Sequence, residues 1–336
     1  MGLVVSPVDS RDGPIAWGVL STARIAGRLV GGARTSDGAE VVAVASRNDA
    51  SAQRFAEAHG IPRAHGSYEA LLADPDVEAV YIPLPNSMHV EWTLRALEAG
   101  KHVLCEKPMD RRPEQVERAF DFAAQRGLVL SEAFMWRHNP QTAALRDLLE
   151  ERAIGDVRLV RASFSFMLVR DPDVRLDPAL DGGALMDVGC YCVSGVRLVA
   201  GRDPLSVSAE VATGPTGVDM RLTGLLRFDD DVLAVIDCGL DLPSRSELEI
   251  CGTQGRIVIG DPWHCIEPRI VLERGYDREV IMIPAADSYA LELTDMAVAI
   301  RDGREPLLGR ADALGQARTI DALYRSAAAG HAVPVG

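Results

Sequence analysis

A carboxylate and a phenol stand four residues apart in the segment DGGALMDVGCYCV, residues 181–193. Residues at this spacing share one face of an α-helix, so Asp187 and Tyr191 are expected to lie one above the other. A carboxylate accepts hydrogen bonds, and a phenol can exchange a proton with an oxygen whose charge changes. The pair indicates acid–base chemistry that needs a cation, because the ordinary pKa of a phenol is about 10.

Lys107 is the candidate cation, and it is one of only two lysines in the chain, with Lys101. It stands in the segment CEKPMD, after an apolar run that predicts a strand, and Pro108 restricts it to an extended conformation. Ligands bind at the carboxyl ends of the strands in open parallel sheets. An ammonium beside Tyr191 is expected to favour the phenolate and lower the pKa of the phenol. The group would then support hydride transfer to or from a carbonyl carbon.

The first part of the chain alternates apolar runs with helical patterns. Strands are expected at residues 15–20, 40–45, 77–83, 102–106 and 128–132, and helices at about 23–31, 49–59, 88–99 and 113–126. Gly60, Gly100 and Gly127 each follow a helix, as C-terminal glycines do. This alternation predicts a doubly wound parallel sheet of Rossmann type.

The pattern changes after about residue 136. Helices are expected at 140–151, 183–199, 288–303 and 310–330, and extended segments at 157–168, 205–213, 218–228, 231–240, 246–252, 255–260, 269–273 and 278–283. Short turns between successive extended segments predict an open, mostly antiparallel sheet. We therefore predict an α/β protein with a loose tail at 1–14, a dinucleotide-binding domain at 15–135, and an α+β substrate domain at 136–336.

The segment GVLSTARIAG follows the first strand and is the candidate phosphate-binding turn. Such a turn brings backbone amides at a helix N-terminus to a pyrophosphate. The candidate residues are Gly18, Ser21, Thr22, Ala23 and Ile25. Ser21 and Ala23 replace expected glycines but are small, so an ordinary strand-to-helix turn stays an open alternative.

The end of the second strand carries Ser46 and Arg47 in the segment ASRND. A hydroxyl and a cation there suit the 2′-phosphate of NADP, whereas an NAD site usually has an acid. Asp49 is better explained as the N-cap of the next helix. The pattern favours NADP over NAD, and the alternative for Arg47 is a solvated loop residue.

Composition excludes several classes of function. The chain has 336 residues and a net charge of −14 without a basic stripe, which argues against nucleic-acid binding. No apolar run approaches the roughly 20 residues of a membrane span, and the N-terminus lacks a secretory signal. The six cysteines show no disulfide framework, so we expect reduced thiols and a cytoplasmic protein. The histidine and cysteine spacings predict no metal site.

Four segments occur together and in order: YIPLPNSMH (81–89), GKHVLCEKP (100–108), EAFMWRHNPQ (132–141) and GGALMDVGCY (182–191). With them the chain resembles the glucose–fructose oxidoreductase and inositol dehydrogenase family, Gfo/Idh/MocA. The tyrosine that ends the last segment is similar to the branch with NADP-dependent D-xylose dehydrogenases and dimeric dihydrodiol dehydrogenases.

The resemblance implies roles for particular residues. Lys107 and Tyr191 take the positions of the catalytic lysine and tyrosine, Asp187 that of an aspartate that frames the substrate, and the Lys107–Pro108 bond is expected to be cis. The open sheet face often forms a dimer in this family, so a homo-oligomer is expected. Two departures, Asp181 for a glycine and Asn139 for a histidine, leave the substrate open.

The remaining candidates flank these positions. On the cofactor side they are Pro85, Asn86, His89 and Glu106, although His89 could equally cap its helix. On the substrate side they are Trp136 and Arg137, followed by Phe164, Phe166 and Arg170.

The expected function is an NAD(P)-dependent oxidoreductase for a sugar, polyol or cyclic diol. Alternatives are a ketoreductase of a nucleotide-linked deoxysugar, an NAD-dependent glycosidase, and a nucleotide-binding protein without turnover.

Overall fold

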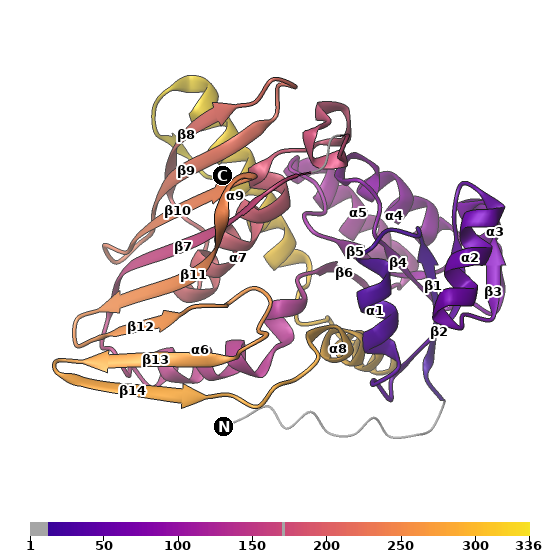
Figure 1. The fold of residues 1–336 in the computed structure, drawn as a ribbon, viewed down its shortest axis with the longest axis horizontal. Helices are drawn as coiled ribbons and strands as arrows, with labels where there is room; N and C mark the ends of the chain where they lie inside the picture. The colour runs from indigo at the N-terminus through magenta and orange to yellow at the C-terminus, as the bar shows by residue number, and fades with distance from the viewer. Residues whose placement is uncertain (1–12, 170–171) are drawn as a thin grey trace.

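The computed structural model describes residues 13–169 and 172–336. Most of the predicted tail and the candidate Arg170 therefore lie outside the described residues. In the described part, a parallel sheet with flanking helices stands beside a large open sheet, as Figure 1 shows. This is the α/β fold that the sequence predicts.

The parallel sheet has six strands in the described residues, in the order β3-β2-β1-β4-β5-β6. They are β1 (Ile15–Leu20), β2 (Ala39–Ala45), β3 (Arg63–His65), β4 (Ala79–Ile82), β5 (His102–Glu106) and β6 (Leu130–Ala133). This order is that of the dinucleotide-binding doubly wound fold. The central strands are buried on both faces, which explains their continuous apolar sequences. The sequence did not predict β3, which has three half-buried residues.

The helices around this sheet are α1 (Ala26–Ala33), α2 (Asp49–His59), α3 (Tyr68–Leu72), α4 (His89–Glu98) and α5 (Pro113–Arg126). Gly60 and Gly127 end α2 and α5 in the left-handed conformation that glycine adopts without strain. Gly100, one residue beyond the C-cap of α4, also has a positive φ. The predicted helix ends are thus confirmed, whereas the short α3 was not predicted.

The second sheet has nine strands in the described residues, in the order β14-β13-β12-β11-β7-β10-β9-β8-β15. They are β7 (Val157–Met167), β8 (Ser206–Thr213), β9 (Asp219–Arg227), β10 (Leu233–Gly239), β11 (Asp241–Gly252), β12 (Arg256–Ile259), β13 (Arg269–Arg274), β14 (Asp277–Met282) and β15 (Val333–Pro334). All its pairs are antiparallel except β7 with β10, which is parallel. The sheet is therefore mostly antiparallel, as predicted.

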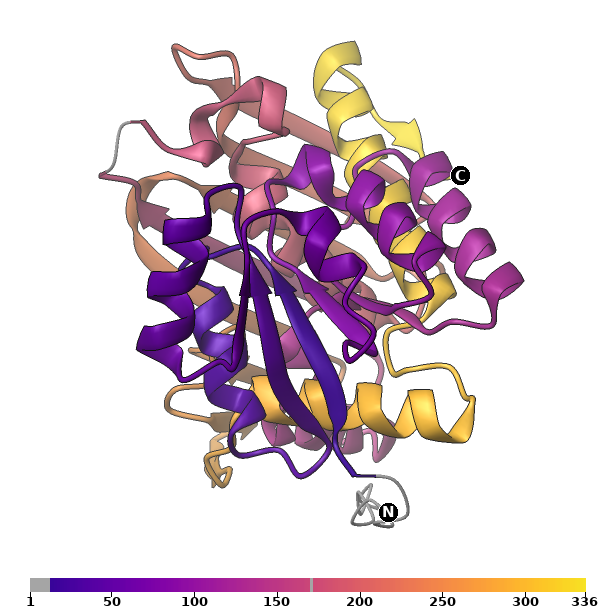
Figure 2. The ribbon, with the colours of Figure 1, turned by 90° about the vertical axis from the view of Figure 1, so that its right-hand side faces the viewer.

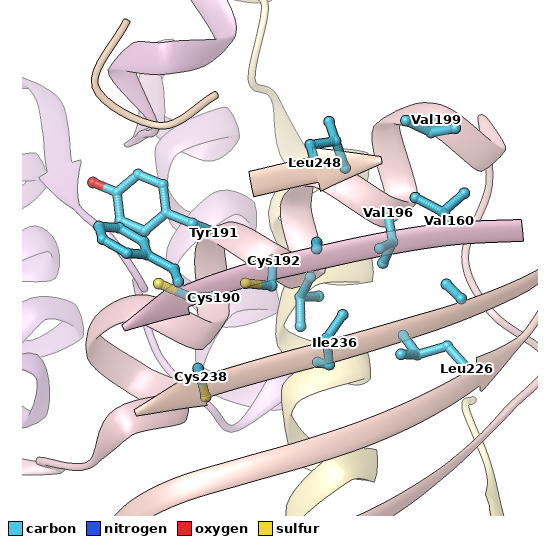
Figure 3. Packing of buried hydrophobic residues seen from close by; sticks show 14 of the residues in the cluster. Val160, Cys190, Tyr191, Cys192, Val196, Val199, Leu226, Ile236, Cys238 and Leu248 are labelled. Carbon is cyan, nitrogen blue, oxygen red and sulfur yellow. The ribbon is translucent and has the colours of Figure 1, made fainter. Parts of the chain in front are cut away.

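Helix α7 (Cys190–Ala200) covers the inner face of this sheet, and α6 (Pro140–Glu150) lies near its other end. Residues Leu185–Gly189, directly before α7, form a π-helical turn. The predicted continuous α-helix over 183–199 is thus wrong in its first turn. Figure 3 shows the apolar side of α7, including Cys192, Val196 and Val199, packed against Val160 and Ile236 of the sheet.

The last two helices are α8 (Ser288–Asp302), which packs beside the parallel sheet, and α9 (Arg310–Ala329), which spans both halves and also packs against β8 of the second sheet. Helix α8 packs against α1, where a Cβ on Gly32 would lie 2.7 Å from the Cβ of Tyr289. Helix α9 packs against α5, and its Leu314 belongs to a core cluster of the parallel sheet. Figure 2 shows α8 crossing the lower end of that sheet. Parts of α8 and α9 therefore belong to the core of the parallel sheet, whereas most buried residues after about 136 form a separate core.

One segment of the described chain, Pro178–Ala200, is long and apolar enough to cross a membrane by length and composition alone. The sequence was expected to contain no such segment. Its most apolar window is 78% buried inside the fold, and it contains the π-helical turn and α7. The segment is therefore a core helix whose apolar character is explained by packing.

Candidate active site

The loop that leaves β5 places Lys107 at the carboxyl edge of the parallel sheet, and the Lys107–Pro108 peptide bond is cis, as expected. Two buried side chains hold this loop. A ring nitrogen of His89 lies 2.9 Å from the carbonyl oxygen of Pro108, and Glu132 accepts a 2.7 Å hydrogen bond from the backbone N–H of Met109. The loop is thus anchored on both sides of the sheet edge.

Lys107, Asp187 and Tyr191 come together at this edge. The Lys107 ammonium donates a 2.8 Å hydrogen bond to the main-chain oxygen of Asp187 and lies 3.8 Å from its carboxylate. The same nitrogen lies 4.9 Å from the centre of the Tyr191 ring. The structure therefore brings together the three residues that the sequence singled out, with the lysine over the face of the ring.

The π-helical turn gives Asp187 its position in this group. Such turns widen the helix by one residue and are frequent at functional sites. Asp187 presents both its main-chain carbonyl and its carboxylate to Lys107. The sequence spacing suggested that Asp187 and Tyr191 lie on one face of a regular α-helix. In the structure Asp187 lies in a π-helical turn before Tyr191, and Lys107 contacts both residues.

Tyr191 is 8% exposed and packs edge-on against Phe134 and Phe164, with ring centres 5.5 and 5.4 Å away. Figure 3 shows it at the end of the core cluster, with its hydroxyl directed away from the other labelled side chains. Burial, followed by the negative charges of Glu106 and other neighbours, raises the pKa of Tyr191 well above its ordinary value. The expectation that Lys107 lowers this pKa is wrong here, and the phenol holds its proton.

Lys107 stays charged in this environment. Burial lowers the pKa of its ammonium, but Cys190, Asp187 and Glu106 together raise it above its ordinary value. Glu106, the last residue of β5, accepts a hydrogen bond from the Tyr81 hydroxyl and one from the Lys107 backbone N–H. Burial raises the pKa of Glu106. Glu106 thus contacts the backbone of Lys107, and its predicted role in cofactor binding stays a prediction.

Three further side chains at this site escaped the sequence analysis. Arg175 donates a 2.6 Å hydrogen bond from Nε to the Asp187 carboxylate. Glu292 on α8 lies close enough to Tyr191 for its negative charge to raise the pKa of that phenol. Tyr289, also on α8, lies close enough to Lys107 for the ammonium to act against the rise in the Tyr289 pKa that burial causes. Glu292 is 1% exposed, and within the described residues its carboxyl oxygens have no hydrogen-bond partner. No motif marks these positions, because only folding brings them near Lys107.

The candidate dinucleotide end lies at the carboxyl ends of β1 and β2. Gly18 is buried inside β1, and a Cβ there would lie 2.6 Å from Leu71, so its small size serves core packing and not close approach to a phosphate. Residues 21–25, which include Thr22 and Ile25, form the turn into α1, and the Ser21 hydroxyl accepts a 3.0 Å hydrogen bond from the Ala23 N–H. The first turn of α1 carries no acid, so this helix start suits an anion.

Arg47 is exposed just beyond β2, next to Ser46, and its guanidinium lies close enough to Tyr68 to lower the pKa of that phenol, although burial raises this pKa overall. The alternative of a solvated loop residue therefore stays open, and the guanidinium lies near Tyr68 at the edge of the sheet. A helix start without an acid and an exposed cation just beyond β2 fit the pyrophosphate and the 2′-phosphate of NADP. A nicotinamide would then extend toward Lys107 at the end of β5.

Several other candidate residues have structural partners. His89 is 1% exposed, and its two ring nitrogens lie 2.8 and 2.9 Å from the carbonyl oxygens of Leu84 and Pro108, so it joins two loops and does not cap its helix. Pro85 begins a short 3₁₀ turn. Asn86 donates a 2.8 Å hydrogen bond to the main-chain oxygen of Asp181. The predicted cofactor contacts of these residues stay predictions.

Trp136 and Arg137 are also held within the protein. Trp136 is 1% exposed and packs edge-on against Trp263, with ring centres 5.1 Å apart. Arg137 lies 3.3 Å from both the Asp312 carboxylate and the Ser194 hydroxyl, which ties it to α9 and α7. These contacts explain the burial of both side chains without a substrate and do not support the predicted substrate contacts.

Asp181 links the two halves of the protein. It has a φ of 52°, a left-handed conformation that aspartate tolerates better than most residues, and its carboxylate lies 3.3 Å from Nε of Arg111. Its main-chain oxygen accepts the bond from Asn86. Within the described residues, no group of three His, Cys, Asp or Glu side chains could hold a metal ion.

Glu132 is 2% exposed, and burial raises its pKa to about 8. The folded protein therefore keeps a proton on Glu132 at pH values where the unfolded chain has released it. The stability that this provides is complete below the ordinary pKa of 4.5 and is lost as the pH rises through about 8.

We expect Glu132→Gln to reduce this loss, because the amide stays neutral and still accepts the bond from Met109. Urea unfolding at about pH 5 and about pH 9 should show a smaller drop in the free energy of unfolding than in the wild type, by on the order of 4 kcal/mol. Glu114→Gln, at an exposed position of α5, is the control and should leave the drop unchanged. An identical drop in the Glu132 variant would contradict the assignment.

Comparison with known proteins agrees with this geometry. A family model described as an oxidoreductase family with an NAD-binding Rossmann fold matches residues 16–134, and the GFO/IDH/MocA C-terminal domain matches residues 142–258. D-xylose 1-dehydrogenase (NADP(+)) 2 of Haloferax volcanii is 38% identical over 322 residues, which cover 94% of this chain and 98% of the relative.

Two other relatives are similar along much of the chain. Trans-1,2-dihydrobenzene-1,2-diol dehydrogenase of Homo sapiens is 35% identical over 273 residues, covering 80% of this chain and 81% of the relative. The crystal structure of KijD10, a 3-ketoreductase from Actinomadura kijaniata in complex with NADP and TDP-benzene, superimposes with a TM-score of 0.88 at 36% identity, covering 93% of this chain and 98% of the other. The chain therefore belongs to the GFO/IDH/MocA family of oxidoreductases and is an enzyme.

Proposed function

We propose that the enzyme transfers a hydride between NADP and a carbonyl or hydroxyl carbon of a sugar, a polyol or a related cyclic diol. The observation that carries this proposal is the contact of Lys107 with both Asp187 and the Tyr191 ring at the carboxyl edge of the parallel sheet. The names of the relatives support the substrate class, because they include an NADP-dependent xylose dehydrogenase and a dihydrodiol dehydrogenase.

Each residue has a defined task in this mechanism. The cofactor, when bound, supplies or accepts the hydride. Tyr191, whose pKa is raised, holds a proton on its hydroxyl and gives it to the substrate oxygen during reduction. The Lys107 ammonium stabilises the negative charge that this transfer leaves on the phenol. Asp187 fixes Lys107 through its main-chain oxygen, and its carboxylate can accept a substrate hydroxyl.

A ketoreductase of a nucleotide-linked deoxysugar is the second candidate. It is favoured by the similarity to the dTDP-3,4-didehydro-2,6-dideoxy-alpha-D-glucose 3-reductase of Actinomadura kijaniata, which is 37% identical over 320 residues. Both candidates use the same acid–base group. An NAD-dependent glycosidase would show no net change of cofactor, and a nucleotide-binding protein without turnover does not need an ammonium over a buried phenol.

We also propose that the enzyme acts in the cytoplasm and as a homo-oligomer. The open face of the large sheet supports an assembly through that surface, because Leu225 and Leu233 are 48% and 41% exposed on adjacent parts of β9 and β10. Apolar side chains at such positions are typical of an interface between copies.

The reaction class can be tested by the absorbance of the reduced nicotinamide. The purified wild type, supplied with NADP, should oxidise at least one aldose, polyol or cyclic diol, and the absorbance of NADPH should rise. Turnover only with a dTDP-linked ketosugar and NADPH would favour the second candidate. Release of sugar from a nitrophenyl glycoside without a net cofactor change would reject both.

With a substrate in hand, Tyr191→Phe should lower kcat by about a thousandfold, because the variant has no acid to protonate the substrate oxygen. NADPH binding, measured by fluorescence, should stay within about threefold, since the phenyl ring still fills the same space. Tyr324→Phe removes a comparable hydroxyl contact, 3.0 Å from Asp219, and should leave kcat nearly unchanged. Normal turnover of the Tyr191 variant would show that another group supplies the proton.

Arg47→Ala tests the preference for NADP. Loss of the guanidinium should weaken NADPH binding by about tenfold or more, because the 2′-phosphate loses a charged hydrogen-bond donor. Affinity for NADH should change little. Arg54→Ala on α2, which removes a neighbouring exposed arginine bonded to Ser51, is the matched control. Equal losses of NADPH and NADH affinity in the Arg47 variant would exclude a role in selecting NADP.

A further inference from the structure

Arg175 lies outside the four segments that mark the family, but its backbone contacts Gly182 and Gly183 of the last of these segments. The N–H of Gly183 donates a 2.9 Å hydrogen bond to the carbonyl oxygen of Arg175. A Cβ on Gly182 would collide with that same oxygen. The absence of side chains at these two glycines therefore lets the backbone of Arg175 pack directly before the π-helical turn that holds Asp187.

The guanidinium of Arg175 is also held in place. The Asp173 carboxylate accepts a 3.0 Å hydrogen bond from the Arg175 backbone N–H and lies 3.3 Å from the Arg175 guanidinium. The guanidinium also lies over the Phe166 ring, 5.8 Å from the ring centre. From this position Nε donates to one oxygen of the Asp187 carboxylate at 2.6 Å. An arginine fixed by its own backbone, an acid and a ring imposes one geometry on the carboxylate that it binds.

Asp187 therefore stands between two cations. Its Oδ2 is bonded to Arg175, whereas its Oδ1 lies 3.8 Å from the Lys107 ammonium, beyond hydrogen-bond distance. Lys107 instead donates to the main-chain oxygen of Asp187 at 2.8 Å. The carboxylate is thus closer to the arginine than to the lysine, although all three side chains are partly or largely buried.

We propose that Arg175 is a positioning residue for the reaction, which acts by holding the Asp187 carboxylate away from the Lys107 ammonium. The ammonium then follows the main-chain oxygen and stays over the Tyr191 ring, 4.9 Å from its centre. Without Arg175 the carboxylate turns to Lys107, forms a closer ion pair and neutralises the charge that Tyr191 needs beside it.

The two lysines of the chain allow a direct test that needs no substrate. Acetylation by acetic anhydride, followed by mass spectrometry, measures the reactivity of each amine in the folded protein. Lys101 is the internal reference, because its ammonium is buried and bonded to the main-chain oxygens of Asp74 and Val77. Lys107 reacts in proportion to the fraction of its amine that is free of a proton.

Arg175→Gln should slow the labelling of Lys107 by about threefold or more, since a closer carboxylate favours the charged amine, and leave Lys101 unchanged. In the Asp187→Asn background the same substitution should slow the labelling much less, because only the direct repulsion between Arg175 and Lys107 is lost and no carboxylate is left to turn; an equal slowing in both backgrounds would overturn the proposal. Unchanged labelling in the first comparison would overturn the proposal. Faster labelling in both backgrounds would also overturn it, because Arg175 would then merely cover Lys107.

A second arm uses turnover and rests on the proposed function. Arg175→Gln should lower kcat by about tenfold with little change in NADPH affinity, Arg175→Lys should restore part of the loss, and the effect should disappear in the Asp187→Asn background. Arg325→Gln breaks an exposed pair with the same atoms and distance, Nε to Asp321 Oδ2 at 2.6 Å, and is the control. An equal loss in both backgrounds would assign Arg175 to the loop structure instead.

The two arms separate the failure of this inference from failure of the proposed function. A wild type without turnover on any sugar, diol or ketosugar would reject the proposed function, and the labelling arm would still decide the role of Arg175. A wild type with turnover but without the background dependence would reject the role of Arg175 alone.

Discussion

The site depends on the need to compensate one ammonium at the end of β5. The Lys107 side chain is 13% exposed, and a charge removed from water in this way is costly unless hydrogen bonds and opposite charges replace the solvent. The hydrogen bond in this compensation comes from the main-chain oxygen of Asp187, which is far from Lys107 in the chain, and Glu106 adds a further opposite charge. The contact between the π-helical turn and the edge of the parallel sheet therefore stabilises the buried charge of Lys107.

The loop around Lys107 is held by buried groups, each with a local task. His89 joins the loop after β4 to the cis Lys107–Pro108 loop, and Glu132 binds the backbone just beyond it. Burial raises the pKa of both Glu132 and Glu106.

Helices α8 and α9 make contacts between the two halves of the chain that the sequence pattern did not predict. Their sequences follow directly on the strands of the second sheet, so the pattern assigned them to that domain. In the structure Gly32 of α1 makes room for α8, and Leu314 of α9 fills the core under the parallel sheet. Apolar periodicity shows that a helix has a buried face but not which surface covers it.

The sequence by itself determined the order of elements and the ends of many of them. β1, β5, α2 and α5 have the predicted bounds because apolar runs, caps and terminal glycines are local signals. It also identified Lys107, Asp187 and Tyr191, since their types and neighbours are unusual. The short β3 and α3 were missed because they contain too few residues to show a period.

Only the tertiary structure decided how the identified residues meet. It placed Lys107 over the ring of Tyr191, raised the pKa of that phenol where the sequence had indicated a fall, and gave Gly18, His89 and Arg137 structural partners. It also supplied Arg175, which no motif marks. The reason is physical: burial, charge and hydrogen bonding depend on distances between segments far apart in the chain, and local patterns carry no information about those distances.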